Sequence, residues 1–323
     1  MNLAKFLRAQ IGQISYSCKA RSSFPKIWQQ IKAIKYINFE ELPPISKTKD
    51  EVWAISVVKN EIDILPASIE HLLRQGIDRI IILDNLSTDG TSQYLHEISA
   101  QNPNIFVGTD SNPAHQQSEK MTYLATLAWS RGAKWIIPFD ADEFWYAPQR
   151  TLKEFFNSCN HDVVYAGFHH TVPVLADPEN ITESELVMDA AYSFPAKVAF
   201  RSHPLAVIIP GNHEVNRIGA RTLGLEIVHV QYRGPQQIAK KVRQGTESSR
   251  LTGEELDWFS PHWVAGSLLS DAELESVWAK ISHGEPEQRI KFAAEGPMIR
   301  GRFLQWMSWD EHSEFSDLWK DKK

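Results

Sequence analysis

Residues 52–85, "VWAISVVKNEIDILPASIEHLLRQGIDRIIILDN", contain two apolar runs with a helical pattern between them. The runs 52–58 and 79–85 are rich in Val and Ile, which is typical of buried strands. The segment 64–76 has apolar residues at helical spacing and ends at Gly76, a residue type that often follows the last helical turn. The stretch therefore predicts a strand, a helix and a second strand that runs parallel to the first.

The alternation of strands and helices continues after residue 85. "STDGTSQYLHEISA" (87–100) begins with Ser, Thr and Asp, the residue types that cap helix N-termini. A third strand (104–110), a third helix (118–132) and a fourth strand (134–139) are expected to follow. Four strands in regular alternation with helices predict an α/β fold, Rossmann-like, with a mostly parallel sheet flanked by helices.

The same patterns divide the chain into three regions. Residues 1–50 form a basic extension and linker, 51–244 form the α/β domain, and 245–323 are mostly helical and rich in Trp. We therefore expect one large α/β domain with helical N- and C-terminal extensions.

Composition narrows the class of protein. The formal net charge of -6 gives no basic field, so nucleic acid is not expected as a partner. Cys18 and Cys159 lie far apart, which indicates neither a disulfide framework nor a structural zinc site. No uninterrupted apolar run of about 18 residues and no signal-peptide pattern is present, so the expectation is a cytoplasmic protein.

The first 39 residues are unusual in charge. They contain seven Lys or Arg and no acid, with apolar residues between them. One interpretation is a basic amphipathic helix in peripheral contact with the inner, anionic membrane face. The other is a set of helices that pack on the main domain, and spacing alone does not separate the two.

Polar residues follow each expected strand of the α/β domain. Ligands of open parallel sheets bind beyond the carboxyl ends of the strands, so these residues are the first candidates for a site. The turn after the first strand, "VVKNEIDIL", has no glycine and therefore does not predict a phosphate loop. The strands end in Lys59, Asn60 and Glu61; in Asp84, Asn85, Ser87 and Asp89; in Asp110; and in Asp140 and Asp142.

An edge this acidic would admit phosphates only with a cation between them. Mg²⁺ and Mn²⁺ prefer carboxylate oxygens, so we expect a metal-bridged nucleotide diphosphate. Alternate residues of an extended segment point the same way, which lets Asp140 and Asp142 face one cation. The alternative is that both are turn or cap residues.

Three segments together resemble a known family. "VVKNEIDIL", "ILDNLSTDGT" and "IIPFDADEFW" are similar to the signature blocks of family-2-type glycosyltransferases with the GT-A fold, especially the bacterial branch with a D-x-D-E-F-W block. The resemblance covers about residues 52–235. It implies a metal-dependent, inverting transferase that moves a sugar from a nucleotide-diphosphate sugar to a hydroxyl of a carbohydrate or lipid-linked acceptor, in polysaccharide or glycolipid synthesis.

The resemblance also implies roles for single residues. Asp140 would lie near the ribose or the metal, and Asp142 of this DxD motif would ligate Mn²⁺ or Mg²⁺. His229 would be a further metal ligand, or a structural histidine. His213 of "PGNHEV" is a weaker candidate for that role or for phosphate, and Lys240 lies on the helix that follows. The nucleotide would be held by Asn60, Glu61, Asp84, Ser87, Asp89 and Asp140.

The catalytic base does not follow from the resemblance. The Glu-Asp pair that supplies it in the commoner family pattern is absent between residues 150 and 235. Glu214, Asp189 and Asp177 are the candidates. Glu143 has three open roles, as support for the metal ligands, as a helix cap or as the base.

Two rival functions and one aromatic feature remain to be weighed. A nucleotidyltransferase shares such a fold and metal site, but it would carry a Gly-rich basic loop after the first strand. A non-catalytic carbohydrate- or membrane-binding scaffold would explain the missing base, although Asp140 and Asp142 are intact. Trp145 and the C-terminal tryptophans would stack on sugar rings or pack in the core.

Overall fold

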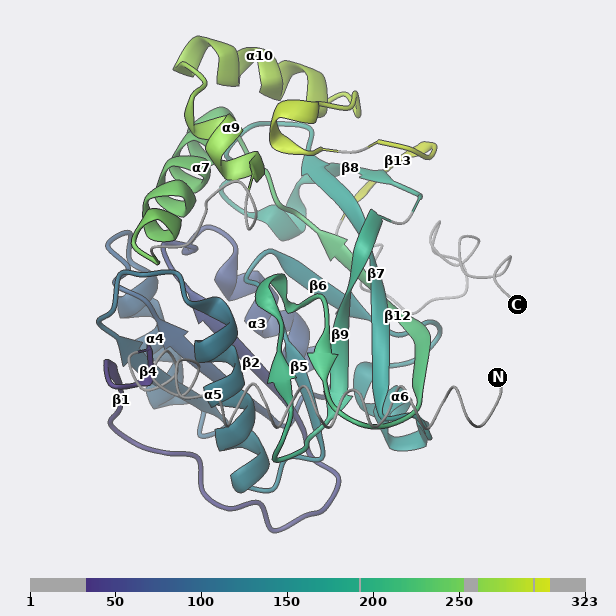
Figure 1. Cartoon of the computed structure of the whole chain (residues 1–323). Coiled ribbons are helices and arrows are strands. Elements are labelled where there is room, and N and C mark those ends of the chain that lie inside the picture. The colour runs from purple at the N-terminus through teal and green to yellow at the C-terminus, as the bar shows by residue number, and fades with distance from the viewer. Residues whose placement is uncertain (1–32, 192, 253–260, 293, 303–323) are drawn as a thin grey trace.

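The structure is a computed structural model, and it describes residues 33–191, 193–252, 261–292 and 294–302. A central mixed sheet with the strand order β1-β4-β3-β2-β5-β9-β7-β12-β6 runs through it, with helices on both faces (Figure 1). The α/β fold expected from the sequence is therefore confirmed.

The regular elements have the following bounds. The strands are β1 (Ile37–Phe39), β2 (Val52–Val58), β3 (Arg79–Asp84), β4 (Ile105–Asp110), β5 (Trp135–Pro138), β6 (Glu143–Tyr146), β7 (Val163–Pro173), β8 (Glu185–Asp189), β9 (Ser193–Arg201), β10 (Val207–Ile208), β11 (Val215–Asn216), β12 (Arg221–His229) and β13 (Met298–Arg302). The helices are α3 (Leu65–Arg74), α4 (Thr91–Gln101), α5 (Gln117–Ser130), α6 (Leu152–Ser158), α7 (Pro235–Arg250), α9 (Pro261–Ser267) and α10 (Asp271–Ile281), with 3-10 turns η1 (Ile181–Glu183), η2 (Pro210–Asn212) and η3 (Gln288–Ile290).

The parallel half of the sheet is β4-β3-β2-β5, the four strands expected from the sequence. Alternate residues of each strand enter opposite cores because successive side chains point to opposite faces. Ile80 and Ile82 of β3 pack with α3 and α4, whereas Ile81 and Leu83 pack with α5. Each such fully buried side chain contributes about 1.5–3 kcal/mol, so both faces must be covered by helices.

The second half of the sheet brings a distant strand to the end of β5. β12 runs parallel to β7 and antiparallel to β6. In this register His229 pairs with Glu143 on one side and with His170 on the other. The topology thus carries the last residue of β12 to the turn that follows β5.

The C-terminal helices form a third apolar cluster with the β7–β8 region. Ile238 and Val242 of α7 pack there with Trp278 of α10. The boundary predicted between residues 244 and 245 falls within α7, which continues to Arg250, and the division into domains stays a prediction. The described part of 245–302 is mostly helical, as expected, but β13 adds a strand that pairs with β8. Of the C-terminal tryptophans, Trp258, Trp306, Trp309 and Trp319 lie outside the described residues.

The N-terminal expectation is tested only at its end. Residues 1–32, where the amphipathic pattern is strongest, lie outside the described residues. Residues 37–39 are not helical, because they form β1 and pair with the edge of β4. No helix within the described residues is long and apolar enough to span a membrane.

A buried histidine, His71, joins α3 to β6. Nε2 of His71 lies 2.7 Å from the backbone oxygen of Trp145, and the imidazole ring is fully buried beside Tyr146. Burial lowers the pKa of His71 to about 4 from 6.5. The neutral ring is therefore favoured in the folded protein, and its contribution to stability is lost as pH falls from 6.5 towards 4.

We expect His71→Gln to flatten the acid limb of the stability curve. Between pH 6.5 and 4 the wild type should lose about 3 kcal/mol more than the variant, since each unit of pKa shift is worth about 1.4 kcal/mol. Urea unfolding at a series of pH values measures this difference. His96→Gln removes an exposed imidazole from α4 and is the control; equal slopes for wild type and His71→Gln would contradict the assignment.

Candidate active site

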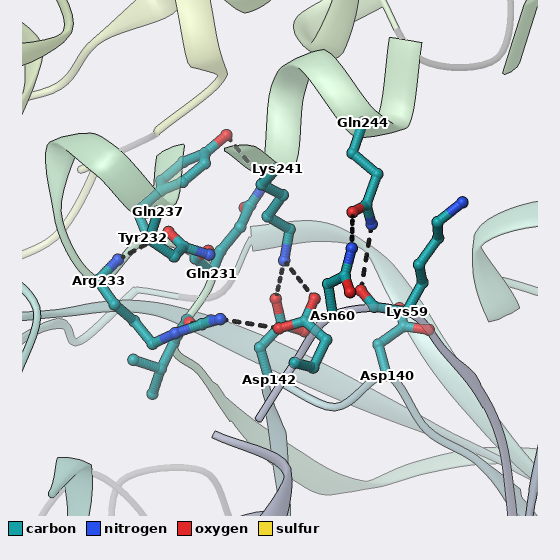
Figure 2. Close-up of polar contacts among 12 residues, drawn as sticks. Lys59, Asn60, Asp140, Asp142, Gln231, Tyr232, Arg233, Gln237, Lys241 and Gln244 are labelled. Carbon is teal, nitrogen blue, oxygen red and sulfur yellow. Dashed lines mark hydrogen bonds and ion pairs between the residues drawn. The ribbon is translucent and has the colours of Figure 1, made fainter. Parts of the chain in front are cut away.

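The carboxyl ends of the parallel strands meet beneath one helix, α7 (Figure 2). Lys241 reaches the turn after β5, where it pairs with Asp142. Gln244 bonds the loop after β2, by 2.5 Å to the side chain of Asn60 and by 3.1 Å to the backbone oxygen of Lys59. Lys240 pairs at 2.9 Å with Asp89, after β3. One helix therefore contacts three of the four loops that the sequence singled out.

Asp142 is almost fully enclosed, with a side chain 4% exposed. Its oxygens contact Lys241 and, at 3.5 Å, Nε2 of His229. Burial acts to raise the pKa of Asp142, but Lys241 and His229 hold it well below its usual value. The carboxylate is thus ionised at neutral pH.

Asp140 faces a different set of partners. Lys197 of β9 pairs with it at 2.7 Å, and the amides of Gln117 and Asn212 donate to it at 3.2 and 3.1 Å. Its side chain is 31% exposed, so it is the open member of the pair. Burial opposes ionisation, but Lys197 lowers the pKa of Asp140 below its ordinary value.

The extended geometry expected for residues 140–142 is not what the structure shows. The backbone turns there, and the amide of Glu143 donates to the backbone oxygen of Asp140 at 3.0 Å. The turn lets Asp140 contact Lys197 while Asp142 contacts Lys241. Alternation along a strand was the wrong premise because β5 ends at Pro138, before the motif.

Glu143 stabilises this turn through its buried carboxyl group. Its carboxylate accepts the backbone N–H of Asp140 at 3.1 Å and pairs with Lys197 at 2.7 Å. The indole N–H of Trp145 donates to it at 3.3 Å, and that tryptophan is fully buried. Burial raises the pKa of Glu143 to about 8. Glu143 is 1% exposed, so it positions Asp140 and Lys197, and Trp145 belongs to the core.

Glu61 belongs to a second buried ion cluster beside Asp142. Arg233, which follows β12, donates to Glu61 at 2.8 Å and to Asp63 at 2.5 Å. Lys241 lies 3.8 Å from Glu61, so it bridges Glu61 and Asp142. Burial raises the pKa of Glu61 despite Lys241 and Arg233. This cluster ties the loop after β2 to the end of β12.

The remaining nucleotide candidates form one loop scaffold. Asn60 has a positive φ of 57°, a conformation that Asn tolerates better than most residues. Its backbone N–H donates to Ser87 at 2.9 Å, and its side chain accepts from the amide of Thr88 at 2.7 Å. Asp84 is 6% exposed and accepts the amide of Ser87 at 3.3 Å, while Asp89 holds Thr91.

Asp110 faces the protein interior. It pairs with Lys120 at 2.6 Å, and both side chains are fully buried. The amide of Asn85 donates to the same carboxylate at 2.9 Å. Asp110 is therefore a structural group, although it ends a strand as the ligand candidates do.

The candidate bases are not brought to Asp142 by contacts of their own. Glu214 pairs with Arg221 at 2.6 Å, at the start of β12, whereas His229 marks the end near the site. Asp189 is 1% exposed and accepts backbone N–H groups of Ala191, Glu295 and Gly296 at 2.8–3.0 Å. Both carboxylates have structural partners, and the identity of the catalytic base stays a prediction. The backbone N–H of Asp177 donates to the backbone oxygen of Arg233 at 2.6 Å, and burial raises the pKa of its carboxyl group.

Two residues next to those named from the sequence contact the turn after β5. In "PGNHEV" Asn212 bonds Asp140, while Nδ1 of His213 lies 3.2 Å from the backbone oxygen of Ala196. On α7 Lys241 contacts Asp142, while Lys240 pairs with Asp89. The sequence reading missed Lys197, Asn212, Arg233, Lys241 and Gln244.

Comparison with known proteins gives the family. Residues 53–213 match the family described as glycosyl transferase family 2. This part of the chain is a family 2 glycosyltransferase domain. The enzyme class expected from the sequence is thereby confirmed. No curated protein sequence matches the chain significantly.

Several solved structures are similar to this glycosyltransferase at 12% sequence identity. The mannosyltransferase PcManGT from Pyrobaculum calidifontis, in complex with GDP-Man and Mn²⁺, matches over 84% of each chain with a TM-score of 0.36. S. aureus TarS 1-349 matches over 68% of this chain and 70% of its own, with a TM-score of 0.32. HddC from Yersinia pseudotuberculosis matches over 58% of this chain and 97% of its own, with a TM-score of 0.34.

The residues present fit a divalent cation whose coordination shell is completed by the substrate. Within the described residues, no group of three or more His, Cys, Asp and Glu side chains is placed to hold a metal by itself. Asp142 and His229 nevertheless offer an ionised carboxylate and an imidazole nitrogen 3.5 Å apart. Mg²⁺ commonly takes one or two carboxylates and fills its other positions with water and substrate phosphates.

Lys120→Met should destabilise the glycosyltransferase strongly. Removing one partner of a buried ion pair leaves Asp110 charged and uncompensated, which costs about 3–5 kcal/mol. Arg74→Met breaks a pair with Glu70 in which both side chains are more than half exposed, and it should cost less than about 1 kcal/mol. Denaturant unfolding compares the two; similar losses would show that Asp110 is not a structural ion.

Proposed function

We propose that this glycosyltransferase moves a sugar from a nucleotide-diphosphate sugar to an acceptor hydroxyl with the help of Mn²⁺ or Mg²⁺. The observation that carries the proposal is the ionised Asp142, held beside His229 and under α7 at the carboxyl edge of the sheet. Ligands of open α/β sheets bind at this edge. The family match supports the reaction class.

The nucleoside is proposed to lie on the loops after β2 and β3. Asn60 and Ser87 are tied to each other, and Asp84 holds the same turn, so these residues present one rigid surface. Asp89 fixes the start of α4 through Thr91. Glu61 lies between this surface and Asp142, which supports a place for it at the ribose side.

The cation is proposed to bind Asp142 and His229, with Asp140 at the open side of the same turn. When bound, it would neutralise the charge that develops on the departing diphosphate. Lys197 keeps Asp140 ionised, and Glu143 holds the backbone N–H of Asp140 in place. Asp140 is 31% exposed and therefore available to a ligand, which supports its role towards the ribose or the metal.

The proposed stereochemistry and acceptor class are supported by the family resemblance, and the proposed membrane contact is supported by composition. Direct displacement with inversion is the reaction we propose, because the three signature segments resemble those of inverting family-2-type enzymes. The acceptor would be a carbohydrate or a lipid-linked sugar. Work at the cytoplasmic membrane face is supported by the basic composition of residues 1–39.

Asp142→Asn should abolish Mn²⁺-dependent binding of nucleoside diphosphate. The amide keeps the shape of the side chain but removes the charge that attracts a hard cation. Titration calorimetry of UDP and GDP, each with and without Mn²⁺, measures the effect.

The matched control for this variant is Asp271→Asn, whose carboxylate is 83% exposed at the start of α10. It should bind as the wild type does. Thermal unfolding checks that Asp142→Asn is folded, and unchanged metal-dependent binding by that folded variant would remove Asp142 from the cation site.

A further inference from the structure

Lys241 pairs with Asp142, the carboxylate proposed to bind the divalent cation (Figure 2). Its ammonium group lies 3.8 Å from Glu61, and the Lys241 side chain is 17% exposed. Within the described residues, the side chains that pair with the Asp142 carboxylate are Lys241 and the imidazole of His229. Any divalent cation that binds Asp142 must therefore displace Lys241 or share the carboxylate with it.

The charge balance of the cluster opposes sharing. Glu61, Asp63 and Asp142 face Arg233 and Lys241, so the carboxylates exceed the cationic side chains by one. A divalent cation added to this cluster reverses the sign of its charge in a partly buried space, where unbalanced charge is costly. The diphosphate of a bound donor restores the balance.

Of the two cationic side chains, only Lys241 is free to move. Arg233 is 2% exposed and donates to Glu61, to Asp63 and to the backbone oxygen of Val230, which fixes its guanidinium. Within the described residues, the ion pairs of Lys241 are with Asp142 and Glu61, and its four-carbon stem is flexible.

The helix that carries Lys241 has anchoring contacts that do not involve this side chain. Gln244 holds α7 to Asn60 and to the backbone of Lys59, and Ile238 and Val242 pack in the third apolar cluster. A change of rotamer at Lys241 therefore requires no movement of α7.

We propose that Lys241 makes cation binding conditional on the donor. In the donor-free enzyme Lys241 holds Asp142 as a built-in counter-ion. When donor and cation bind together, the cation takes Asp142 and the ammonium group of Lys241 turns to the oxygens of the diphosphate. The inference rests on the proposed function, since it assigns a further substrate-binding residue to the same site.

The test is a titration of Lys241→Met with Mn²⁺ alone and then with UDP and GDP. Without nucleotide the variant should bind Mn²⁺ about tenfold more tightly than the wild type, because the competing cation is gone. In saturating Mn²⁺ it should bind the preferred nucleoside diphosphate about tenfold more weakly, because a phosphate contact is lost. The spin-resonance signal of free Mn²⁺ measures the first quantity, and calorimetry measures the second.

Two variants control the experiment. Arg243→Met removes another α7 cation, which pairs with Asp271 in an exposed position, and it should leave both affinities unchanged. Lys241→Arg keeps the charge and should retain weak binding of Mn²⁺ alone. Lys241→Gln replaces Lys241→Met if thermal unfolding shows that the Met variant is not folded.

The opposite signs of the two effects separate the outcomes. The inference is overturned if the folded Lys241 variant binds Mn²⁺ no more tightly than the wild type does. In that case, Mn²⁺-dependent nucleotide binding by the wild type still supports the proposed function. A wild type that binds neither nucleotide with Mn²⁺ removes the proposed function itself, and the inference with it.

Discussion

Compensation of buried negative charge at the carboxyl edge of the sheet is the constraint on which the rest of the structure depends. Asp142 is almost fully buried, and Asp140 and Glu61 lie beside it. An uncompensated buried carboxylate would cost several kcal/mol, so each needs a cationic partner. The partners come from β9, from the residues after β12 and from α7, which brings these elements of the second half of the chain onto the first.

The elements of the parallel half could be predicted from the sequence because their signal is local. The run 52–58 became β2 with the same bounds, since a strand buried on both faces is a continuous apolar run. The helix expected at 118–132 is α5, Gln117–Ser130. What the sequence did not give was the set of cations, because Lys197 lies 57 positions from Asp140 and Lys241 lies 99 positions from Asp142. Nothing local links residues so far apart.

One of the missed residues had a signal that a helical projection would have found. Successive residues of a helix are about 100° apart, so Lys240 and Lys241 face different directions. The buried positions Ile238 and Val242 define the inner face of α7, and Lys241 flanks that face whereas Lys240 points away from it. The turn after β5 had a signal of the same kind, because Pro138 ends the strand before the motif begins.

Under the proposed function, the ion pairs with Lys241 also explain how an acidic edge of this fold can bind phosphate. A glycine-rich loop binds phosphate with backbone N–H groups and needs no counter-ion, whereas "VVKNEIDIL" offers side-chain charge. At this edge Asp142 and Glu61 hold Lys241, so positive charge already lies where a diphosphate would arrive. The carboxylates thus serve two ends: they offer ligands to a hard cation, and they keep an ammonium group at the site. A fold that lacks the glycine loop can in this way assemble a phosphate site from paired charges of opposite sign.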